Sequence, residues 1–461
     1  MFFDDKVFLE NDKAVELYEY AKSLPIFDYH CHLSPAEILE DKVFYNLTEL
    51  WLNGDHYKWR VMRAYGVDER YVTGEGDDKE KFLHFAQALP HFVGNPVYHW
   101  AHLELKKYFG LTLPICPKNA EEIWESTLSQ MADGSFSAKQ LIVRSGVECV
   151  VTTDDPVDDL RFHKALKEEG NPFEVLPCFR ADRLLNIEKP DYVQYVEKLG
   201  EEAGVEINNF DDLLLAVERR LDYFVSKGAN SVDVGFENFP MGKGTINGAD
   251  QILQNRFEDR PLRQDELGEY KFTLLAKVAE MLRNRNMVLQ LHVGVIRNNN
   301  TVLFEKCGLD CGGDSVANVL DVNLARNLFD FIEKGGGLPK SVVYSLNPTA
   351  YYPLSTLLGD FQGGQKGKLQ LGAAWWFADH RDGIREQMRL LASTGGLGLF
   401  NGMLTDSRSF TSYARHDYFR RIFCSLLGQW VESGEYPDDD ETLKTLVKNV
   451  CIDNAKKYFG V

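Results

Sequence analysis

The stretch that decides the fold is IFDYHCH at residues 26–32, a short apolar run that ends in two histidines one residue apart. It follows a helix-like stretch at 12–23 and is followed at once by the loop residues Ser34 and Pro35. Side chains on a β-strand alternate between its two faces, so His30 and His32 point the same way and are able to share one metal ion. Two histidines this close also occur by chance as surface or core residues, so the rest of the chain must separate the two interpretations.

The composition argues against several classes of partner. The 461 residues include 51 Lys and Arg against 70 Asp and Glu, a formal charge of -19 with no basic run, which speaks against nucleic acid or an anionic membrane. No apolar run approaches the length that spans a bilayer. An anionic substrate would therefore depend on a few well-placed arginines.

Cysteine usage predicts reduced thiols. Eight cysteines at irregular spacing, with no signal peptide, indicate a cytoplasmic chain without disulfides. Cys307 and Cys311 resemble half of a zinc knuckle, but no second pair follows at zinc-site spacing. The favoured interpretation is a loop with two buried thiols.

Strands and helices alternate along most of the chain. Further apolar runs lie at 147–152, 173–179, 231–236, 288–293, 341–346, 369–374 and 399–405, which with the first makes eight predicted strands. Amphipathic stretches long enough for crossover helices separate most of them, including 211–226, 267–283, 322–333 and 385–392. Strands alternating with helices imply a parallel sheet, and eight imply closure into a (β/α)8 TIM barrel.

Two helical additions complete the predicted architecture. The segment at about 35–145 is rich in helix-period patterns and lacks convincing strands, so it is expected to be a large insertion after the first strand. Helices at 413–433 and 440–458 are expected to pack outside the barrel. No repeat or linker indicates a second unit, so residues 1–461 are predicted to form a single domain.

Polar residues at the ends of different strands should meet, because a barrel carries its active site there. The residues in question are His30 and His32, Thr153, Asp154 and Asp155, Arg180, Asp233 and Glu237, His292, Trp375 and Trp376, and Asp406, Ser407 and Arg408. Three histidines and Asp406 make a mixed imidazole and carboxylate site, which suits zinc or a similar divalent ion with one position open.

Several of these residues also have a purely structural interpretation. His292 alone would be taken for a hydrogen-bonded core histidine, and Asp406 for a helix N-cap. Asp154 is better explained as a turn and capping residue than as a catalyst. Trp375 and Trp376 are most often core or wall residues, and as a wall they would shape a sugar pocket.

Longer motifs resemble a known family. The first-strand histidines, His292 and Asp406 resemble the amidohydrolase superfamily, and more narrowly the chain is similar to the uronate isomerase family, also called glucuronate isomerases. The narrower resemblance rests on DHYKWR at 55–60 with Met62-Arg63 after it, FVGNP at 92–96, TTDDP at 152–156, AWWF at 374–377 and GMLTDSR at 402–408. These blocks cover nearly the whole chain.

The resemblance implies an activity and a set of residues. Members of the family isomerise D-glucuronate to D-fructuronate and D-galacturonate to D-tagaturonate. Carried over by position, it implies His30, His32 and Asp406 as ligands of a divalent metal, with His292 beside them; Asp406, Tyr57 and His56 as catalytic residues; and Arg180, Arg408 and Trp375 as substrate-binding residues. Asp233 falls where the family has an aspartate, but its neighbours depart from the expected pattern, so its role stays open.

The residues themselves favour one metal and an isomerase. A two-metal hydrolase of this superfamily needs a bridging lysine on the fourth strand and a histidine on the sixth. The runs at 231–236 and 341–346, which would form these strands, do not supply them. The alternatives are a mononuclear hydrolase or deaminase, in which Asp406 would deprotonate a metal-bound water, and a non-catalytic binder of sugar acids. A hydrolase has no need of a tyrosine proton shuttle with two carboxylate-binding arginines. The expected partners are a small hexuronate and further copies of the chain in a homo-oligomer.

Overall fold

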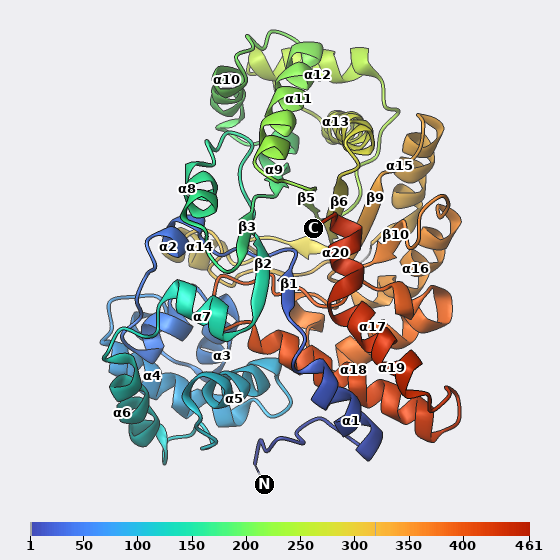
Figure 1. Cartoon of the computed structure of the whole chain (residues 1–461). Helices are drawn as coiled ribbons and strands as arrows, with labels where there is room; N and C mark the ends of the chain where they lie inside the picture. The colour runs from blue at the N-terminus through green and yellow to red at the C-terminus, as the bar shows by residue number, and fades with distance from the viewer. Residues whose placement is uncertain (1, 319) are drawn as a thin grey trace.

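The computed structural model describes residues 2–318 and 320–461 as a mixed α/β fold built on parallel sheets (Figure 1). Its strands are β1 (Ile26–Asp28), β2 (Val147–Val151), β3 (Glu174–Leu176), β4 (Phe179–Arg180), β5 (Ser231–Phe236), β6 (Val288–Val293), β7 (Val295–Ile296), β8 (Ser315–Val316), β9 (Lys340–Ser345) and β10 (Leu369–Leu371). One parallel sheet has the order β1-β2-β3 and the other β10-β9-β6-β5-β4, while β7 and β8 form a small antiparallel pair.

The expected helical insertion is present between β1 and β2. It comprises α2 (Pro35–Leu39), α3 (His56–Tyr65), α4 (Asp78–Ala88), α5 (Pro96–Phe109), α6 (Ala120–Met131) and α7 (Ala138–Arg144). Most of these helices lie together at the lower left of Figure 1, below the β1-β2-β3 sheet. The stretch predicted at 12–23 forms α1 (Asp12–Ala21), capped by the side chain of Asn11.

The remaining helices follow the strands as the alternating pattern predicts. They are α8 (Arg161–Glu169), α9 (Asp182–Leu185), α10 (Tyr192–Ala203), α11 (Phe210–Ser226), α12 (Ile246–Phe257), α13 (Gln264–Asn284), α14 (Thr301–Cys307), α15 (Val322–Lys334), α16 (Tyr351–Asp360), α17 (Arg381–Thr394), α18 (Ala414–Glu432), α19 (Asp440–Lys448) and α20 (Asn454–Phe459). The helix predicted at 440–458 is two helices, because a π-helical turn at Asn449–Asp453 interrupts it. Among the described residues, no helix is both long and apolar enough to cross a membrane.

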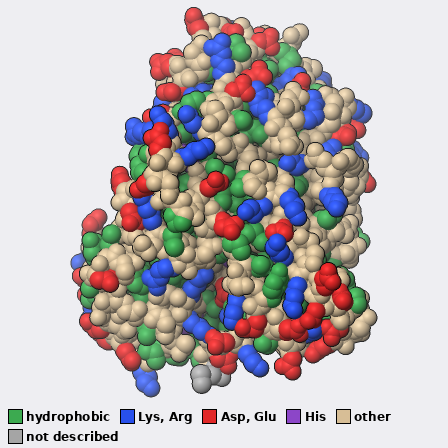
Figure 2. Space-filling model, in the orientation of Figure 1, with side chains coloured by type: hydrophobic (Ala, Val, Ile, Leu, Met, Phe, Trp, Pro, Cys, Tyr) green, Lys and Arg blue, Asp and Glu red, His purple; other side chains and the backbone are tan. Residues whose placement is uncertain are grey.

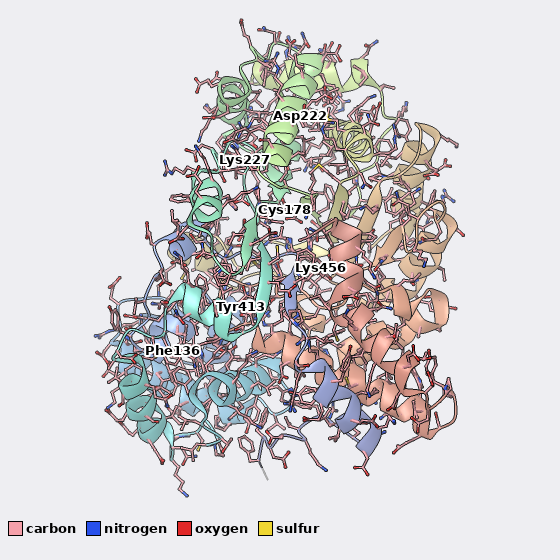
Figure 3. All side chains as sticks on the ribbon, viewed as in Figure 1. Phe136, Cys178, Asp222, Lys227, Tyr413 and Lys456 are labelled. Atoms are coloured by element: carbon pink, nitrogen blue, oxygen red, sulfur yellow. The ribbon has the colours of Figure 1, made fainter. Side chains whose placement is uncertain are left out.

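The run predicted as one strand at 173–179 is divided by Pro177. Proline has no N–H to donate, so it breaks the ladder, and β3 pairs with β2 while β4 pairs with β5. An isolated parallel bridge between Asp154 and Phe179 joins the two sheets at this point. Cys178, labelled in Figure 3, lies in this junction and its thiol contacts the carbonyl of Ser231 at 3.4 Å.

The run at 399–405 is not a regular strand, which corrects the prediction. Gly402 and Asp406 have φ angles of +74° and +45°, which a β-strand does not allow. A Cβ at position 402 would lie 2.1 Å from the carbonyl oxygen of Val450, so only glycine fits there. The two residues directly after the run nevertheless pair with the chain after β1, since the Asp406 N–H donates to His30 O at 3.1 Å and the His32 N–H to Ser407 O at 2.9 Å.

Apolar side chains fill the space between the strands and close one end of it. Phe27, Val288 and Val342 belong to a buried cluster that α20 covers with Tyr458 and Phe459. The Tyr458 hydroxyl donates to the carbonyl of Ser341 at 3.1 Å, which places α20 at the amino end of β9. The carboxyl ends of the strands therefore face the opposite side, where the polar residues collect.

Charged side chains of both signs are spread over the face of the molecule that Figure 2 draws. On the face drawn in Figure 2, lysines and arginines are interspersed with aspartates and glutamates, and acidic side chains gather over α1 and α19. Lys13 on α1 lies within this acidic group and pairs with Asp438 at 2.7 Å.

Candidate active site

The predicted first-strand histidines and Asp406 come together. His30 Nε2 lies 3.3 Å and His32 Nε2 3.0 Å from Asp406 Oδ1, and the three residues form a group whose candidate ligand atoms lie within 4.8 Å of one another. Zinc binds nitrogen and oxygen at about 2.0–2.2 Å, so two of its ligand atoms lie roughly 3 to 4 Å apart. The donor set and its spacing therefore fit one divalent ion.

A second histidine and aspartate group shares His30 with the first. It contains His292 and Asp233, and His292 Nδ1 lies 2.6 Å from Asp233 Oδ1. The Nδ1 atom of His30 and the Nε2 atom of His292 are buried without a hydrogen-bond partner among the described residues. His30, which belongs to both groups, and His292 therefore each keep one ring nitrogen free to take a ligand.

The local electrostatics favour a charged Asp406 and a neutral His32. Burial raises the pKa of Asp406, but hydrogen bonds from His30 and His32 outweigh burial and hold that pKa well below its usual value. Burial lowers the pKa of His32 to about 4. A neutral imidazole and an ionised carboxylate are the forms that bind metal.

Two indoles also hold Asp406 in place. The Nε1 atoms of Trp375 and Trp376 donate to Asp406 Oδ2 at 2.5 and 2.6 Å. Asp406 is a non-glycine residue with positive φ, a conformation that persists only where surrounding contacts enforce it. Trp375 thus lines the cavity and also supports Asp406.

Arg180 lies where the two groups meet. Its Nε donates to Asp182 Oδ2 at 3.1 Å, and its Nη1 lies 3.8 Å from Asp233 Oδ2 and 3.4 Å from His32 Nδ1. Burial opposes the charge on Arg180, but the carboxylates of Asp182 and Asp233 raise its pKa above the usual value. Arg180 is therefore a permanent cation beside the candidate metal ligands.

The insertion contributes His56 and Tyr57 from the first turn of α3. Asp55 caps this helix and accepts the N–H of Tyr57 at 3.0 Å and that of Lys58 at 3.2 Å. The rings of His56 and Tyr57 stack with centroids 4.4 Å apart. Burial raises the pKa of Tyr57 well above its usual value, so its hydroxyl is protonated at neutral pH.

Arg408 already has a carboxylate partner. Its Nη2 donates to Asp310 Oδ2 at 2.6 Å, and both side chains are close to half exposed. Arg297 lies 4.0 Å from the same aspartate and covers the face of Trp376 with its guanidinium 5.4 Å from the ring centroid. The segment that contains Asp310 therefore lies across the mouth of the site.

A single cavity of about 390 Å³ brings the predicted residues together. Its lining includes every predicted site residue: His30, His32, His56, Tyr57, Arg180, Asp233, His292, Trp375, Asp406 and Arg408. The volume lies within the range of small-molecule sites, roughly 300–1,000 Å³. Glu237, also noted at a strand end, does not line this cavity, while Thr153 supports it by contacting His32 Nδ1 through Oγ1 at 2.7 Å.

The sequence interpretation missed Asp182, Arg297 and Asp310, which also line the cavity. Asp182 lies two residues after the predicted site residue Arg180, and this closeness in the sequence could have identified it as a candidate. Asp310 lies between Cys307 and Cys311, so the loop that resembled a zinc knuckle supplies a carboxylate instead. All eight cysteines are free, as expected; Cys311 is buried, but Cys307 is only partly buried.

Comparisons with known proteins agree over the whole length. Residues 1–459 match the family model described as glucuronate isomerase. A uronate isomerase of Caldanaerobacter subterraneus subsp. tengcongensis is 46% identical over 100% of this chain and 99% of its own, and one of Clostridium perfringens is 44% identical over 99% of each. The crystal structure of a uronate isomerase from Thermotoga maritima has a TM-score of 0.94 at 35% identity, with 100% of both chains covered. A glucuronate isomerase structure from Caulobacter crescentus has the same fold, with a TM-score of 0.91 at 24% identity, covering 99% of this chain and 97% of its own.

Proposed function

Because the chain belongs to the glucuronate isomerase family, we propose that it converts D-glucuronate to D-fructuronate and D-galacturonate to D-tagaturonate. Both reactions are aldose to ketose isomerisations of a hexuronate. The observation that carries the proposal is the meeting of a metal-ligand set, two arginines and a buried tyrosine hydroxyl in one cavity.

His30, His32 and Asp406 would hold one divalent ion, and zinc is the best match to two imidazoles and a carboxylate. When bound, the ion supplies positive charge that stabilises negative charge on the sugar oxygens. His292 stands beside this set, with its ring centroid 4.7 Å from that of His30. Elemental analysis of the purified protein tests the identity and number of the ions.

Two arginines would bind the substrate as an anion. Arg180 is a permanent cation inside the cavity, and Arg408 reaches its rim, where Asp310 now accepts its hydrogen bond. When the substrate binds, its carboxylate would replace that of Asp310 as the partner of Arg408, so the guanidinium would keep a counter-charge. Asp233 and Trp375 would contact the body of the sugar.

Two side chains, Asp406 and Tyr57, would carry out the proton transfers of the isomerisation. Asp406 accepts the hydrogen on C2 as a proton and returns it to C1, so one C–H bond breaks and another forms. Tyr57 gives its hydroxyl proton to O1 as the enediol forms and takes a proton from O2 as the ketone forms. His56, stacked on Tyr57, lies next to this transfer.

The test is direct. Zinc-loaded protein is incubated with D-glucuronate and D-galacturonate, and ketose formation is followed by NMR, with D-glucose and D-galactose as matched sugars that lack the carboxylate. We expect turnover of the uronates only. Absence of ketose, together with hydrolysis of an ester or amide, would favour the mononuclear hydrolase or deaminase instead.

We also infer that the strands form a (β/α)8 TIM barrel within a single domain of residues 1–461. Three contacts support closure: the bridge at Asp154, the pairing of residues 406–407 with the chain after β1, and Gln370, whose side chain bonds the backbone of Leu399 and Asn401. A crystal structure would test whether β10 pairs with the 399–405 run.

The cytoplasm and a homo-oligomer remain predictions. Free cysteines support a reducing compartment, because eight unpaired thiols would be at risk of oxidation outside it. Light scattering of the purified chain measures the number of subunits, and fractionation of the source cell tests the compartment.

A further inference from the structure

Arg415 is a buried cation that lies behind the cavity without lining it. It is the second residue of α18 and is 2% exposed. Its guanidinium covers two aromatic faces, with the carbon Cζ 4.0 Å from the ring centroid of Trp100 and 5.1 Å from that of Tyr57. The Tyr57 and Trp100 rings meet edge to face, with centroids 5.5 Å apart. One side of Tyr57 therefore rests on a fixed, charged surface.

Two groups hold Arg415 in this position. Its Nη1 donates to the carbonyl oxygen of Thr405 at 3.0 Å and lies 3.9 Å from Asp379 Oδ2. Thr405 directly precedes Asp406, and Asp379 follows the turn that carries Trp376. The guanidinium thus connects the backbone next to the proposed base with the ring of the proposed proton shuttle.

The contact needs a charged arginine in a buried environment. Burial lowers the pKa of Arg415, but the carboxyl groups of Asp379, Asp55 and Glu104 raise it, so the side chain stays charged. Asp55 is also the residue that caps α3 and accepts the Tyr57 N–H. A cation attracts an aromatic face more strongly when both are removed from water, so the buried guanidinium favours one position of the Tyr57 ring.

We propose that Arg415 is a positioning residue that holds the Tyr57 hydroxyl in place for proton transfer in the isomerisation. The inference rests on the proposed function, because Tyr57 is a shuttle only if a hexuronate is isomerised here. Arg415 acts through Tyr57 and touches no substrate, since the cavity lining does not include it.

The same helix provides a matched control. Arg421 is 5% exposed, lies with its Cζ 4.1 Å from the ring centroid of Tyr18, and bonds Asp417 at 2.9 Å. Its chemistry is that of Arg415, but neither it nor its partners line the cavity. Arg421→Met therefore reports what the loss of a buried, stacked arginine in α18 does by itself.

The experiment is a double-mutant cycle. Arg415→Met, Tyr57→Phe, the double variant and Arg421→Met are compared for kcat, KM, metal content and melting temperature with D-glucuronate. We expect Arg415→Met to lower kcat about ten- to a hundredfold at nearly unchanged KM and metal content, because a small misplacement of a reacting group has effects of this size. In the Tyr57→Phe background the same change should lower kcat less than about twofold. Arg421→Met should keep the kcat of the folded protein.

Each other outcome has a defined meaning. Equal losses in both backgrounds, or an equal loss of kcat in Arg421→Met, would overturn the inference, because Arg415 would then be only structural. Full activity of Tyr57→Phe would overturn it as well. If Arg415→Met does not fold, Arg415→Lys is used in the same cycle: it keeps the charge but loses the planar face, so a smaller loss should again vanish without the Tyr57 hydroxyl. An inactive parent protein would instead overturn the proposed function.

Discussion

The two histidine and aspartate groups that share His30 differ in how their carboxylates are balanced. Asp233 has His292 at 2.6 Å and the guanidinium of Arg180 at 3.8 Å, so a permanent cation already faces it. Asp406 receives two imidazoles and two indoles, and none of these is a permanent cation. The groups that hold Asp406 are neutral or titratable, whereas Asp233 has a permanent cation of the chain beside it, so we expect a metal ion to bind at the Asp406 group rather than at the Asp233 group.

The strongest test of this comparison removes the carboxylate charge from each group in turn. Asp406→Asn should lose the metal and lower kcat about a hundred- to ten-thousandfold or more, since it removes both a ligand and the proposed base. Asp233→Asn is the matched change and should keep about one ion per chain. Metal content by elemental analysis and kcat with D-glucuronate check both. An Asp233→Asn protein that lost its ion while Asp406→Asn kept it would reverse the assignment of the two groups.

The next largest effect concerns Tyr57, which lines the same cavity as Asp406. Tyr57→Phe should keep metal and substrate binding and lower kcat at least about a hundredfold, because it removes only the hydroxyl that moves a proton. With deuterium at C2, the variant should show a primary isotope effect if enolisation limits its rate. Normal turnover would leave the proton transfer between the oxygens to Asp406 or His56.

Much of the site was predictable because it depends on local rules. The alternation of side chains placed His30 and His32 on one face, and the rule that strand ends converge brought in Arg180, Asp233 and His292. The chain after β1 preserves this pairing although the strand itself ends at Asp28, since the N–H of Cys31 still bonds the carbonyl of Val151 at 3.0 Å.

The rest depends on contacts between distant segments that no local pattern encodes. Asp310 reaches Arg408 across 98 residues, and nothing in its own neighbourhood indicates a binding site. The irregular run at 399–405 follows from the packing of Gly402 against Val450, which the apolar pattern does not reveal. Pro177 was the exception: it was visible in the sequence, and it should have predicted the division of the third strand.

A smaller effect is expected from the two arginines proposed to bind the substrate. Of these, Arg180 also lies beside Asp233, whereas Arg408 does not. Arg180→Met and Arg408→Met should each lower kcat/KM about ten- to a hundredfold, since a charge-assisted contact to a carboxylate contributes on the order of 1.5–3 kcal/mol. Arg180→Met also leaves Asp233 without its cation, so its metal content is measured beside that of Arg408→Met. Normal kcat/KM in both variants would show that the carboxylate binds elsewhere.

The smallest effect on activity is expected at a third histidine and aspartate pair, outside the cavity. His163 Nε2 lies 3.6 Å from Asp154 Oδ2, and Thr152 Oγ1 contacts both side chains. Burial lowers the pKa of His163 to about 4 and raises that of Asp154 to about 7, so at neutral pH the imidazole is uncharged and the carboxyl group is only partly ionised.

The pKa of Asp154 is higher in the folded protein than in the unfolded chain. This difference adds to the free energy of unfolding below the unfolded pKa of about 3.9, and the added stability is lost as the pH rises through the folded value of about 7. Asp154→Asn should remove that dependence. The free energy of unfolding of the parent should therefore fall relative to the variant by on the order of a few kcal/mol between pH 4 and 8, while kcat stays close to that of the parent. Urea unfolding at each pH measures the difference. Parallel curves for the two proteins would mean that Asp154 is already ionised when folded, and that a buried carboxylate in this chain does not need a metal or an arginine to keep its charge.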